Sequence, residues 1–261
     1  MDYLVVCTVA LVVSGLTLFS GFGLGTLLMP AFALFFPVPV AVAATAVVHL
    51  ANNVFKVFLV GRHADWDAVL RFALPAAAAA FAGAWLLNLF ADIPALATYE
   101  LAGREHRITV LKIIVAALII IFAMFDLLPA LRKLTFGRRY LIPGGLLSGF
   151  FGGLSGHQGA LRSAFLINAG LGKEAYIGTT VIASVIVDVA RLFVYGLAFF
   201  SLGSQHLTAA TGYLVAAACA AAFVGAFAGS RLIGKLTLSF VQYLVAAMLI
   251  ASGIAMATGL I

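Results

Sequence analysis

The sequence predicts an all-α polytopic membrane protein made of two inverted repeats, each a broken or re-entrant helical hairpin followed by three transmembrane helices. Hydrophobic residues make up 64% of the 261 residues and charged residues only 9%, whereas a water-soluble domain carries about 25% charged residues. The bilayer must therefore solvate most of the surface, and the backbone must satisfy its hydrogen bonds internally. Long apolar runs favour helices over a β-barrel, whose strands alternate apolar and polar residues.

The apolar residues form eight runs: 3–36, 40–60, 67–90, 108–130, 140–170, 175–200, 206–230 and 240–260. One crossing of the hydrocarbon needs about 20 helical residues, so six runs fit a single span. The first and fifth runs are too long for one crossing and too short for two. Each is interrupted by a glycine-rich segment, at 20–25 and at 152–159. We expect a break inside the membrane at both places, where the backbone faces protein or a water-filled cavity.

The two halves correspond when the sequence is shifted by 135 positions. The matches fall at polar and glycine positions, where chance agreement in an apolar chain is least expected. The matched pairs are Ser20-Gly21 with Ser155-Gly156, Thr45 with Thr180, Asn53 with Asp188, Lys56 with Arg191, Phe58 with Phe193 and Gly61 with Gly196. We interpret residues 1–261 as one membrane transport domain, with repeat 1 at about 1–130 and repeat 2 at about 140–261.

The distribution of charge over the loops predicts the topology. If each broken segment returns to its own side, each half has an odd number of spans and the second half is inverted. The basic loops near Arg62, at 131–139, near Lys173 and at Arg231–Lys235 then share one face, which the positive-inside rule makes cytoplasmic. The loop at 91–107 falls on the outside.

The net charge of +6 does not indicate a nucleic-acid partner. Four of the fifteen basic residues lie in one short loop: Arg132, Lys133, Arg138 and Arg139. The five histidines lack metal-ligand spacing, and Cys7 and Cys219 lie within apolar runs. We expect no metal and no cofactor. The expected partners are a small anion and the lipid bilayer, and a homo-oligomer is possible on sequence grounds.

The glycine breaks are the first candidate site. A helix that begins inside the membrane presents unpaired N–H groups and the positive end of its dipole, which suits an anion. The candidate residues are Gly21, Gly23 and Gly25 in the first break, and Gly156, His157 and Gln158 in the second. The alternative is that glycines only allow close helix packing, which we prefer for Gly225 and Gly229.

A polar stripe follows each break and is the second candidate. Thr45, His49, Asn53 and Lys56 share one helical face, and Thr180, Ser184, Asp188 and Arg191 repeat the same spacing. A charge at the bilayer centre costs about 2.5–3.5 kcal/mol on insertion scales, so it faces a cavity or a partner. Asp188 and Arg191 can pair, which leaves Lys56 less compensated. The alternative for Lys56 is that it snorkels to the interface.

Arg162 follows the second break and, with His157 and Gln158, places donors beside a helix N-terminus. Guanidinium groups match the geometry of oxyanions such as sulfite, sulfonate or carboxylate. His157 could also carry a proton during transport, although a membrane histidine is more often a hydrogen-bonded packing residue. The sequence therefore predicts a cationic, substrate-binding site for a small anion.

Two other functions remain open from the residues alone. Gly153-Leu154-Ser155-Gly156 matches the Gly-x-Ser-Gly pattern of rhomboid-like intramembrane proteases. A nucleophilic serine needs a base within hydrogen-bond reach, and the only later histidines are His157 and His206. The alternatives to transport are thus an intramembrane serine hydrolase that uses Ser155 and a non-transporting membrane partner protein.

Motif order and repeat layout resemble the TauE/SafE family of permeases for sulfite and other organosulfur anions. The resemblance rests on the first break running to Met29-Pro30, the Gly-Gly-Leu-Ser-Gly of the second break, and Gly178-Thr179-Thr180. It implies an anion transporter, not an enzyme, in the bacterial inner membrane, and many members are thought to export sulfite. The second break departs from the family by reading Gly156-His157-Gln158-Gly159 instead of only small residues.

Overall fold

The computed structural model describes residues 1–17, 24–101, 103–128, 136–202, 208–232 and 238–261. The described chain is predominantly helical, which confirms the prediction of an all-α polytopic membrane protein. The helices are α1 (Asp2–Thr17), α2 (Leu24–Ala33), α3 (Val38–Val60), α4 (Trp66–Ala91), α5 (Val110–Leu127), α7 (Leu141–Ser155), α8 (Gly159–Leu166), α9 (Lys173–Leu202), α10 (Ala209–Leu232) and α11 (Leu238–Ala257), with 3₁₀ turns η1 (Gly61–His63) and η2 (Arg138–Tyr140).

Four of the described helices, α3, α4, α9 and α10, are long and apolar enough to cross a membrane. The apolar helices α5 and α11, with 18 and 20 residues, occupy the other two runs for which a single span was predicted. The fifth run is broken as expected, because α7 ends at Ser155 and α8 begins at Gly159. Gly156 has φ of 81° there, a left-handed conformation that favours glycine. In the first run α1 ends at Thr17 and α2 begins at Leu24.

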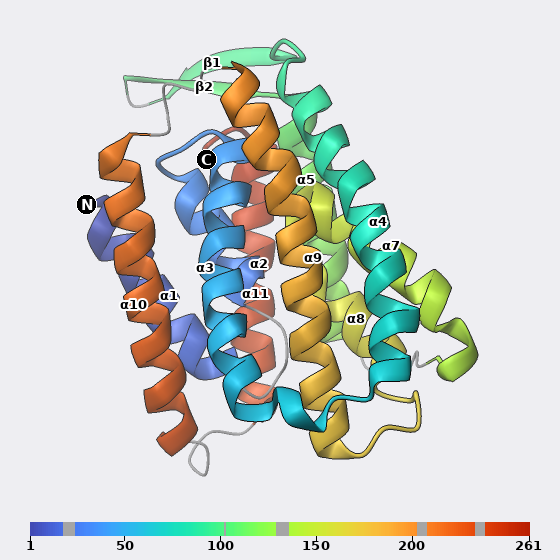
Figure 1. Cartoon of the computed structure of the whole chain (residues 1–261). Coiled ribbons are helices and arrows are strands. Elements are labelled where there is room, and N and C mark those ends of the chain that lie inside the picture. The colour runs from blue at the N-terminus through green and yellow to red at the C-terminus, as the bar shows by residue number, and fades with distance from the viewer. Residues whose placement is uncertain (18–23, 102, 129–135, 203–207, 233–237) are drawn as a thin grey trace.

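The order of helices in the first half recurs in the second. At the shift of 135 positions, α1 corresponds to α7, α2 to α8, α3 to α9, α4 to α10 and α5 to α11. In Figure 1, α3 and α5 run downward while α9 and α11 run upward, and α4 and α10 are likewise opposed. The packing is exchanged in the same way, since α1 packs on α10 and α4 on α7. This is the arrangement of inverted repeats; the repeat boundaries stay a prediction.

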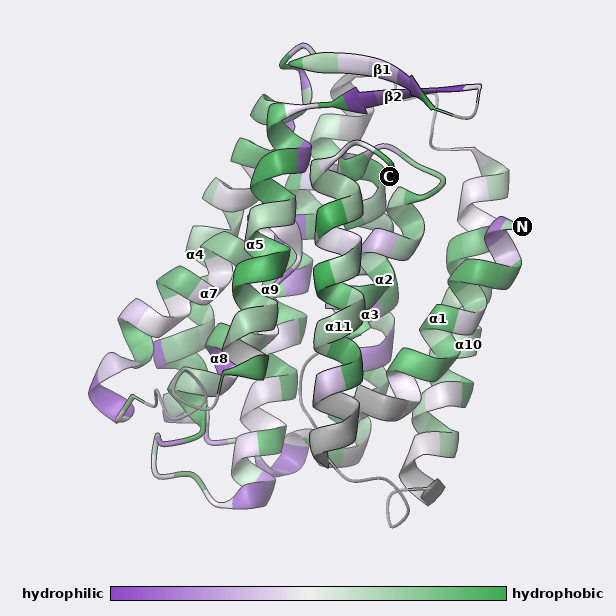
Figure 2. Cartoon of the chain, turned by 180° about the vertical axis from the view of Figure 1, so that it is seen from behind, coloured by the Kyte–Doolittle hydropathy of each residue, from purple (hydrophilic) through white to green (hydrophobic). Residues whose placement is uncertain are grey.

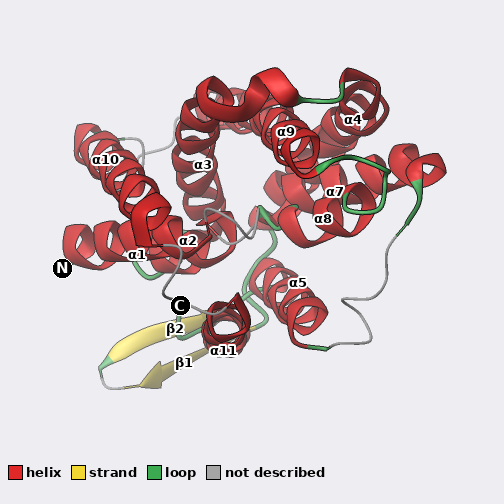
Figure 3. Cartoon of the chain, turned by 90° about the horizontal axis from the view of Figure 1, so that it is seen from below, coloured by secondary structure: helices red, strands yellow, loops and turns green. Residues whose placement is uncertain are grey.

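A seam runs between α3 and α9, which pack directly on each other. Seen along the helix axes in Figure 3, α1 and α10 lie on one side of this seam and α4 and α7 on the other. α5 packs on α11, across the bundle from the seam. The two polar stripes predicted from the sequence lie on α3 and α9, so they belong to the helix pair that forms this seam.

Small residues bring the outer helix pairs into backbone contact. A Cβ at Gly149 of α7 would lie 1.9 Å from the carbonyl oxygen of Ala76 in α4. In the corresponding pair, a Cβ at Gly225 would lie 2.0 Å from the carbonyl oxygen of Leu11, and one at Gly229 would lie 2.4 Å from that of Gly15. The packing role preferred for Gly225 and Gly229 is confirmed. Membrane helices associate through such close contacts because lipid provides no hydrophobic drive between them.

Hydrophilic residues gather at the two ends of the bundle, and the helices between the ends are mostly hydrophobic with a few hydrophilic positions (Figure 2). At one end Arg138 pairs with Asp65 at 2.9 Å and with Asp67 at 3.0 Å. Nearby, His63 lies 3.5 Å from Glu174. Three of the loops predicted to share the basic face therefore do meet. Residues 131–135 and 233–235 of the predicted basic loops lie outside the described residues.

The other end carries a β-hairpin that the sequence analysis did not anticipate in its loop at 91–107. Strands β1 (Ala97–Leu101) and β2 (Arg104–Ile108) pair antiparallel, with Gly103 at φ of 73° in the turn. Tyr99 donates its hydroxyl hydrogen bond to the carbonyl oxygen of Thr258 at 2.6 Å. The hairpin depends on this contact with the C-terminal segment, because an isolated two-stranded hairpin is marginal in water.

We expect Gly149→Ala to destabilise the protein by about 1–3 kcal/mol, because the added methyl group overpacks a backbone contact. Thermal unfolding in detergent measures the loss as a lower Tm. The matched control is Gly196→Ala in α9, where a Cβ would meet nothing within 4 Å among the described residues. Equal unfolding temperatures for the two variants would contradict the packing role.

Asp65 is the N-cap of α4, and we expect Asp65→Ala to cost about 1 kcal/mol. The hydrogen bond from the backbone N–H of Ala68 and the nearby Arg138 hold the pKa of Asp65 below its ordinary value. A carboxyl with a lowered folded pKa stabilises above its unfolded pKa of about 3.9, and the benefit is lost as pH falls through the folded pKa. The Tm difference between wild type and variant should therefore shrink below about pH 4, and a constant difference would argue against this cause.

Candidate functional site

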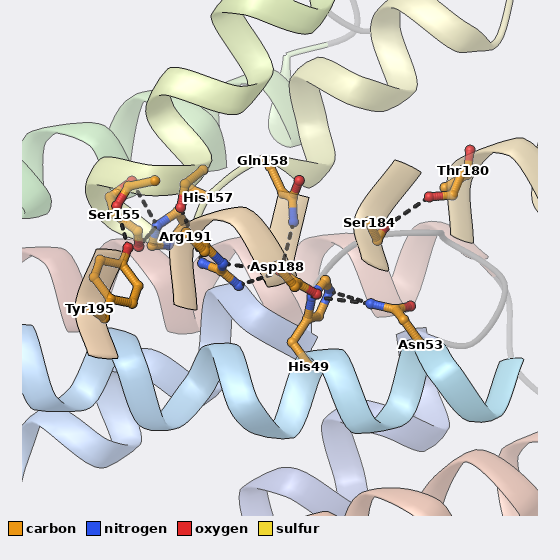
Figure 4. A network of polar contacts seen from close by, with 12 residues as sticks. His49, Asn53, Ser155, His157, Gln158, Thr180, Ser184, Asp188, Arg191 and Tyr195 are labelled. Atoms are coloured by element: carbon orange, nitrogen blue, oxygen red, sulfur yellow. Dashed lines mark hydrogen bonds and ion pairs between the residues drawn. The ribbon is translucent and has the colours of Figure 1, made fainter. Parts of the chain in front are cut away.

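The polar contacts within the bundle centre on the carboxylate of Asp188 in α9, which is fully buried. Its Oδ1 accepts hydrogen bonds from Arg191 Nε at 3.0 Å and Nη2 at 2.7 Å, which confirms the predicted pairing. Its Oδ2 lies 2.7 Å from Nδ1 of His49 in α3. Gln158, in the break between α7 and α8, donates from Nε2 to Oδ1 at 3.2 Å. Three segments of the chain therefore meet at one carboxylate (Figure 4).

The contact with Asp188 sets the tautomer of His49. A carboxylate oxygen only accepts hydrogen bonds, so Nδ1 of His49 carries the proton that it shares with Asp188. In the neutral ring Nε2 is then the acceptor, and Nδ2 of Asn53 lies 3.3 Å from Nε2 and 3.1 Å from Nδ1. Asn53 thus extends the network along α3, one turn beyond His49.

The break itself is stabilised by side chains of α9. The last carbonyl groups of a helix need donors, and α7 ends inside the bundle. Arg191 donates from Nη1 to the carbonyl oxygen of Gly152 at 3.1 Å, and the Tyr195 hydroxyl donates to that of Gly153. Arg191 is also a cation at the negative end of the α7 dipole, which is a favourable place for it. Arg191, one of the residues from which we predicted an anion site, therefore also stabilises the end of α7 at the break.

Repeat 1 reaches the same point through α2. A Cβ at Gly25 would lie 3.6 Å from the carbonyl oxygen of Gly156 and 3.6 Å from Cδ2 of His49. The beginning of α2, the second break and the α3 stripe are thus in contact. Gly21 and Gly23, the other candidates of the first break, lie outside the described residues.

Several buried polar groups along the seam have no hydrogen-bond partner within the described part of the chain. The hydroxyls of Thr45 and Thr180 are two of them, and these residues correspond across the repeats. Both are at most 3% exposed. Asn52 is the third, with both amide atoms unpartnered. The sequence analysis missed Asn52, although its position seven residues after Thr45 and four before Lys56 places it on the same face.

Two further cations lie near the seam. Arg162 of α8 is 2% exposed, and Lys56 of α3 is close enough to it for the two positive charges to repel. Among the described residues, no carboxylate lies within 4 Å of Lys56. Lys56, Arg162 and Arg191 together carry three positive charges around the seam, and Asp188 carries one negative charge. With His49 neutral, the formal excess is two positive charges. The site is cationic in a region that holds little water, and an anion is the natural complement.

Two residues of the predicted site contact backbone carbonyl oxygens close to them in sequence and do not contact Asp188. His157 lies 2.8 Å through Nδ1 from the carbonyl oxygen of Ser155, and its ring stacks on Phe122 with centroids 6.3 Å apart. Ser184 donates its hydroxyl hydrogen bond to the carbonyl oxygen of Thr180 at 2.8 Å, within its own helix. That the remaining candidates bind the substrate stays a prediction. The structure adds that those among the described residues lie along one seam.

The geometry around Ser155 does not fit a nucleophile. Its Oγ donates to the carbonyl oxygen of Phe151 at 3.0 Å. Nδ1 of His157 lies 2.8 Å from the carbonyl oxygen of Ser155 and 3.3 Å from its Oγ. Because a carbonyl oxygen only accepts, Nδ1 carries the proton of the shorter contact and cannot act as a base toward Oγ. His206 lies outside the described residues. The described residues also hold no cluster of three or more His, Cys, Asp or Glu that could bind a metal.

Comparison with known proteins adds one finding. A family model described as "Sulfite exporter TauE/SafE" matches residues 5–256, nearly the whole chain. No curated protein and no solved structure matches the chain.

We expect Thr180→Val to keep or raise the Tm, because it replaces an unpartnered buried hydroxyl with a methyl group of similar shape. Removing such a group relieves a desolvation cost of about 1–3 kcal/mol. The neighbouring Thr179→Val is the matched control, since Thr179 Oγ1 accepts a hydrogen bond from the backbone N–H of Asp65 at 3.0 Å. The control should lower the Tm, and a similar loss for Thr180→Val would show that its hydroxyl has a partner.

Proposed function

The chain belongs to the TauE/SafE sulfite exporter family, and on this premise we propose that it exports sulfite or a related small organosulfur anion across the bacterial inner membrane. Members of this family are membrane transporters and not enzymes. The finer assignments, the anion and the direction, are our proposal. A hydrolase built on Ser155 is set aside, and no feature of the described residues favours a non-transporting partner protein.

The observation that carries the proposal is the excess of buried positive charge along the α3–α9 seam. Arg162 and Arg191 are almost completely buried, and Asp188 is the carboxylate that faces them. A net positive charge in such a place is costly, so we infer that it is retained because it binds an anion. Guanidinium groups match oxyanions with paired, charge-assisted hydrogen bonds. The hydroxyls of Thr45 on α3 and Thr180 on α9 have no hydrogen-bond partner among the described residues, so they are neutral donors along the seam.

The placement of the site supports transport. Inverted repeats hold substrates near the midplane where broken helices meet, and alternate access by rocking one repeat against the other. Here α2, the second break, α3 and α9 meet at His49 and Asp188. Each glycine-packed outer pair joins helices of both halves, so the moving bodies are bundles: α3 with α1 and α10 would tilt against α9 with α4 and α7, and this would open the seam toward one end or the other.

Export is the direction that the membrane potential favours for an anion. An inside-negative potential drives anions outward, whichever end of the bundle faces the cytoplasm. The gain is about 2.3 kcal/mol per charge per 100 mV. Export of a small anion therefore needs no coupling ion. The proposed function holds with or without one.

We expect Arg162→Gln to weaken sulfite binding about 10- to 100-fold, because one charge-assisted hydrogen bond contributes about 1.5–3 kcal/mol. Calorimetry on the purified protein with sulfite, sulfoacetate, sulfate and the zwitterion taurine measures this, with taurine expected to bind least. Arg139→Gln, in the exposed loop, is the control and should leave binding unchanged. Neither heat nor thermal shift with any anion on the wild type would overturn the proposed function.

A further inference from the structure

The donors around Asp188 form a set that would suit an oxyanion. Its two oxygens accept from the Arg191 guanidinium through Nε and Nη2, from Gln158 Nε2 and from His49 Nδ1, all within 3.2 Å. These donors come from α9, from the second break and from α3, which belongs to the other half of the chain. Figure 4 shows them pointing at the same carboxylate from different sides.

A carboxylate and a sulfite or sulfonate group make similar demands on such donors. Each presents oxygens with delocalised negative charge about a small central atom, and each fits the fork of a guanidinium. Asp188 therefore occupies the place in which the substrate of the proposed function would find its best donors. Its side chain is attached to α9 and cannot leave, so it can only exchange partners.

We propose that Asp188 is an internal competitor for the transported anion. Its carboxylate neutralises Arg191 while the site is empty, and the substrate oxyanion takes its place at Arg191 and Gln158 when it binds. Asp188 then keeps the contact of Oδ2 with His49 alone. This inference rests on the proposed function and assigns to Asp188 a role opposite to that of a substrate ligand.

The energetics of buried charge explain why a transporter would need this device. Leaving one partner of a buried ion pair alone is strongly unfavourable. An empty transporter must change conformation with Arg191 inside the membrane, and the carboxylate of Asp188 makes this possible. The same carboxylate limits the affinity for the anion, so that the anion can leave on the far side.

The comparison between the repeats supports this reading. The position that corresponds to Asp188 in repeat 1 is Asn53, which carries no charge, and the position that corresponds to Arg191 is Lys56. Lys56 has no carboxylate within 4 Å among the described residues. Of the two stripes, only that of repeat 2 carries a negative charge. This charge, on Asp188, lies beside Arg191, which also donates to the last turn of α7.

The test is Asp188→Asn in the full-length purified protein. Asparagine keeps the shape but not the charge, so we expect sulfite to bind about tenfold tighter or more, the equivalent of one charge-assisted contact. The preference for the dianion sulfate over the monoanion methanesulfonate should rise as well. Without anion the variant should melt below the wild type, and saturating sulfite should restore its Tm by a larger shift than in the wild type. Asp67→Asn, which removes an exposed charge that pairs with Arg71 and Arg138, should leave the affinity for sulfite and the preference for sulfate unchanged.

A purely structural ion pair predicts other results. The proposal would be overturned if Asp188→Asn bound sulfite no more tightly than the wild type, or if no anion restored its Tm. In that case the proposed function would still stand, provided that the wild type binds sulfite. Failure of the wild type and the variant alike to bind anions would remove the proposed function itself, and this inference with it.

The double variant Asp188→Asn/Arg191→Gln covers the case in which the single variant does not fold. It removes both charges and leaves no lone ion in the bundle. Because this variant removes the competitor and one substrate-binding cation together, we expect the gain and the loss to offset each other, so that sulfite binds about as tightly as to the wild type. Sulfite binding more than about tenfold weaker than to the wild type would contradict the proposal.

Discussion

Two full charges, on Asp188 and Arg191, lie completely buried in a protein whose surface is otherwise solvated by lipid. Burying an ion pair is repaid only when the geometry is good and the remaining hydrogen bonds are made. The structure meets this condition by bringing three segments to the pair. His49 and Gln158 give the carboxylate its other hydrogen bonds, and the carbonyl oxygen of Gly152 accepts a third hydrogen bond from the guanidinium, through Nη1. The broken helix, the α3–α9 seam and the ion pair thus depend on one another.

This dependence explains the contrast between the centre and the periphery. The outer pairs, α1 with α10 and α4 with α7, are held by glycine and alanine backbones in direct contact. The central pair, α3 with α9, carries instead the polar groups, some of them unpartnered in the described chain. Lipid penalises polar groups outside, so every one must turn inward, and a closely packed periphery leaves a polar seam as the place where they collect.

The two halves share a fold and differ in their charges. The stripe in repeat 1 reads Thr45, His49, Asn53 and Lys56, and that in repeat 2 reads Thr180, Ser184, Asp188 and Arg191. The histidine of one half binds the carboxylate of the other. A symmetric pair of stripes would place either two carboxylates or none at the seam. Because the two stripes differ, the seam holds the single carboxylate of Asp188, and the donors of both halves are arranged around it.

The sequence by itself determined the class of protein, the breaks and the faces on which the polar residues lie. In lipid, spanning segments satisfy their backbone hydrogen bonds as helices, and a helix puts Asp188 one turn from Arg191 whatever surrounds it. Only the tertiary structure decided that His49 meets Asp188, that His157 stacks on Phe122, that the buried amide of Asn52 has no partner among the described residues, and that 97–108 is a hairpin against Thr258. Those outcomes depend on how each helix is rotated and how deep it sits, which contacts between distant segments set and no local pattern records.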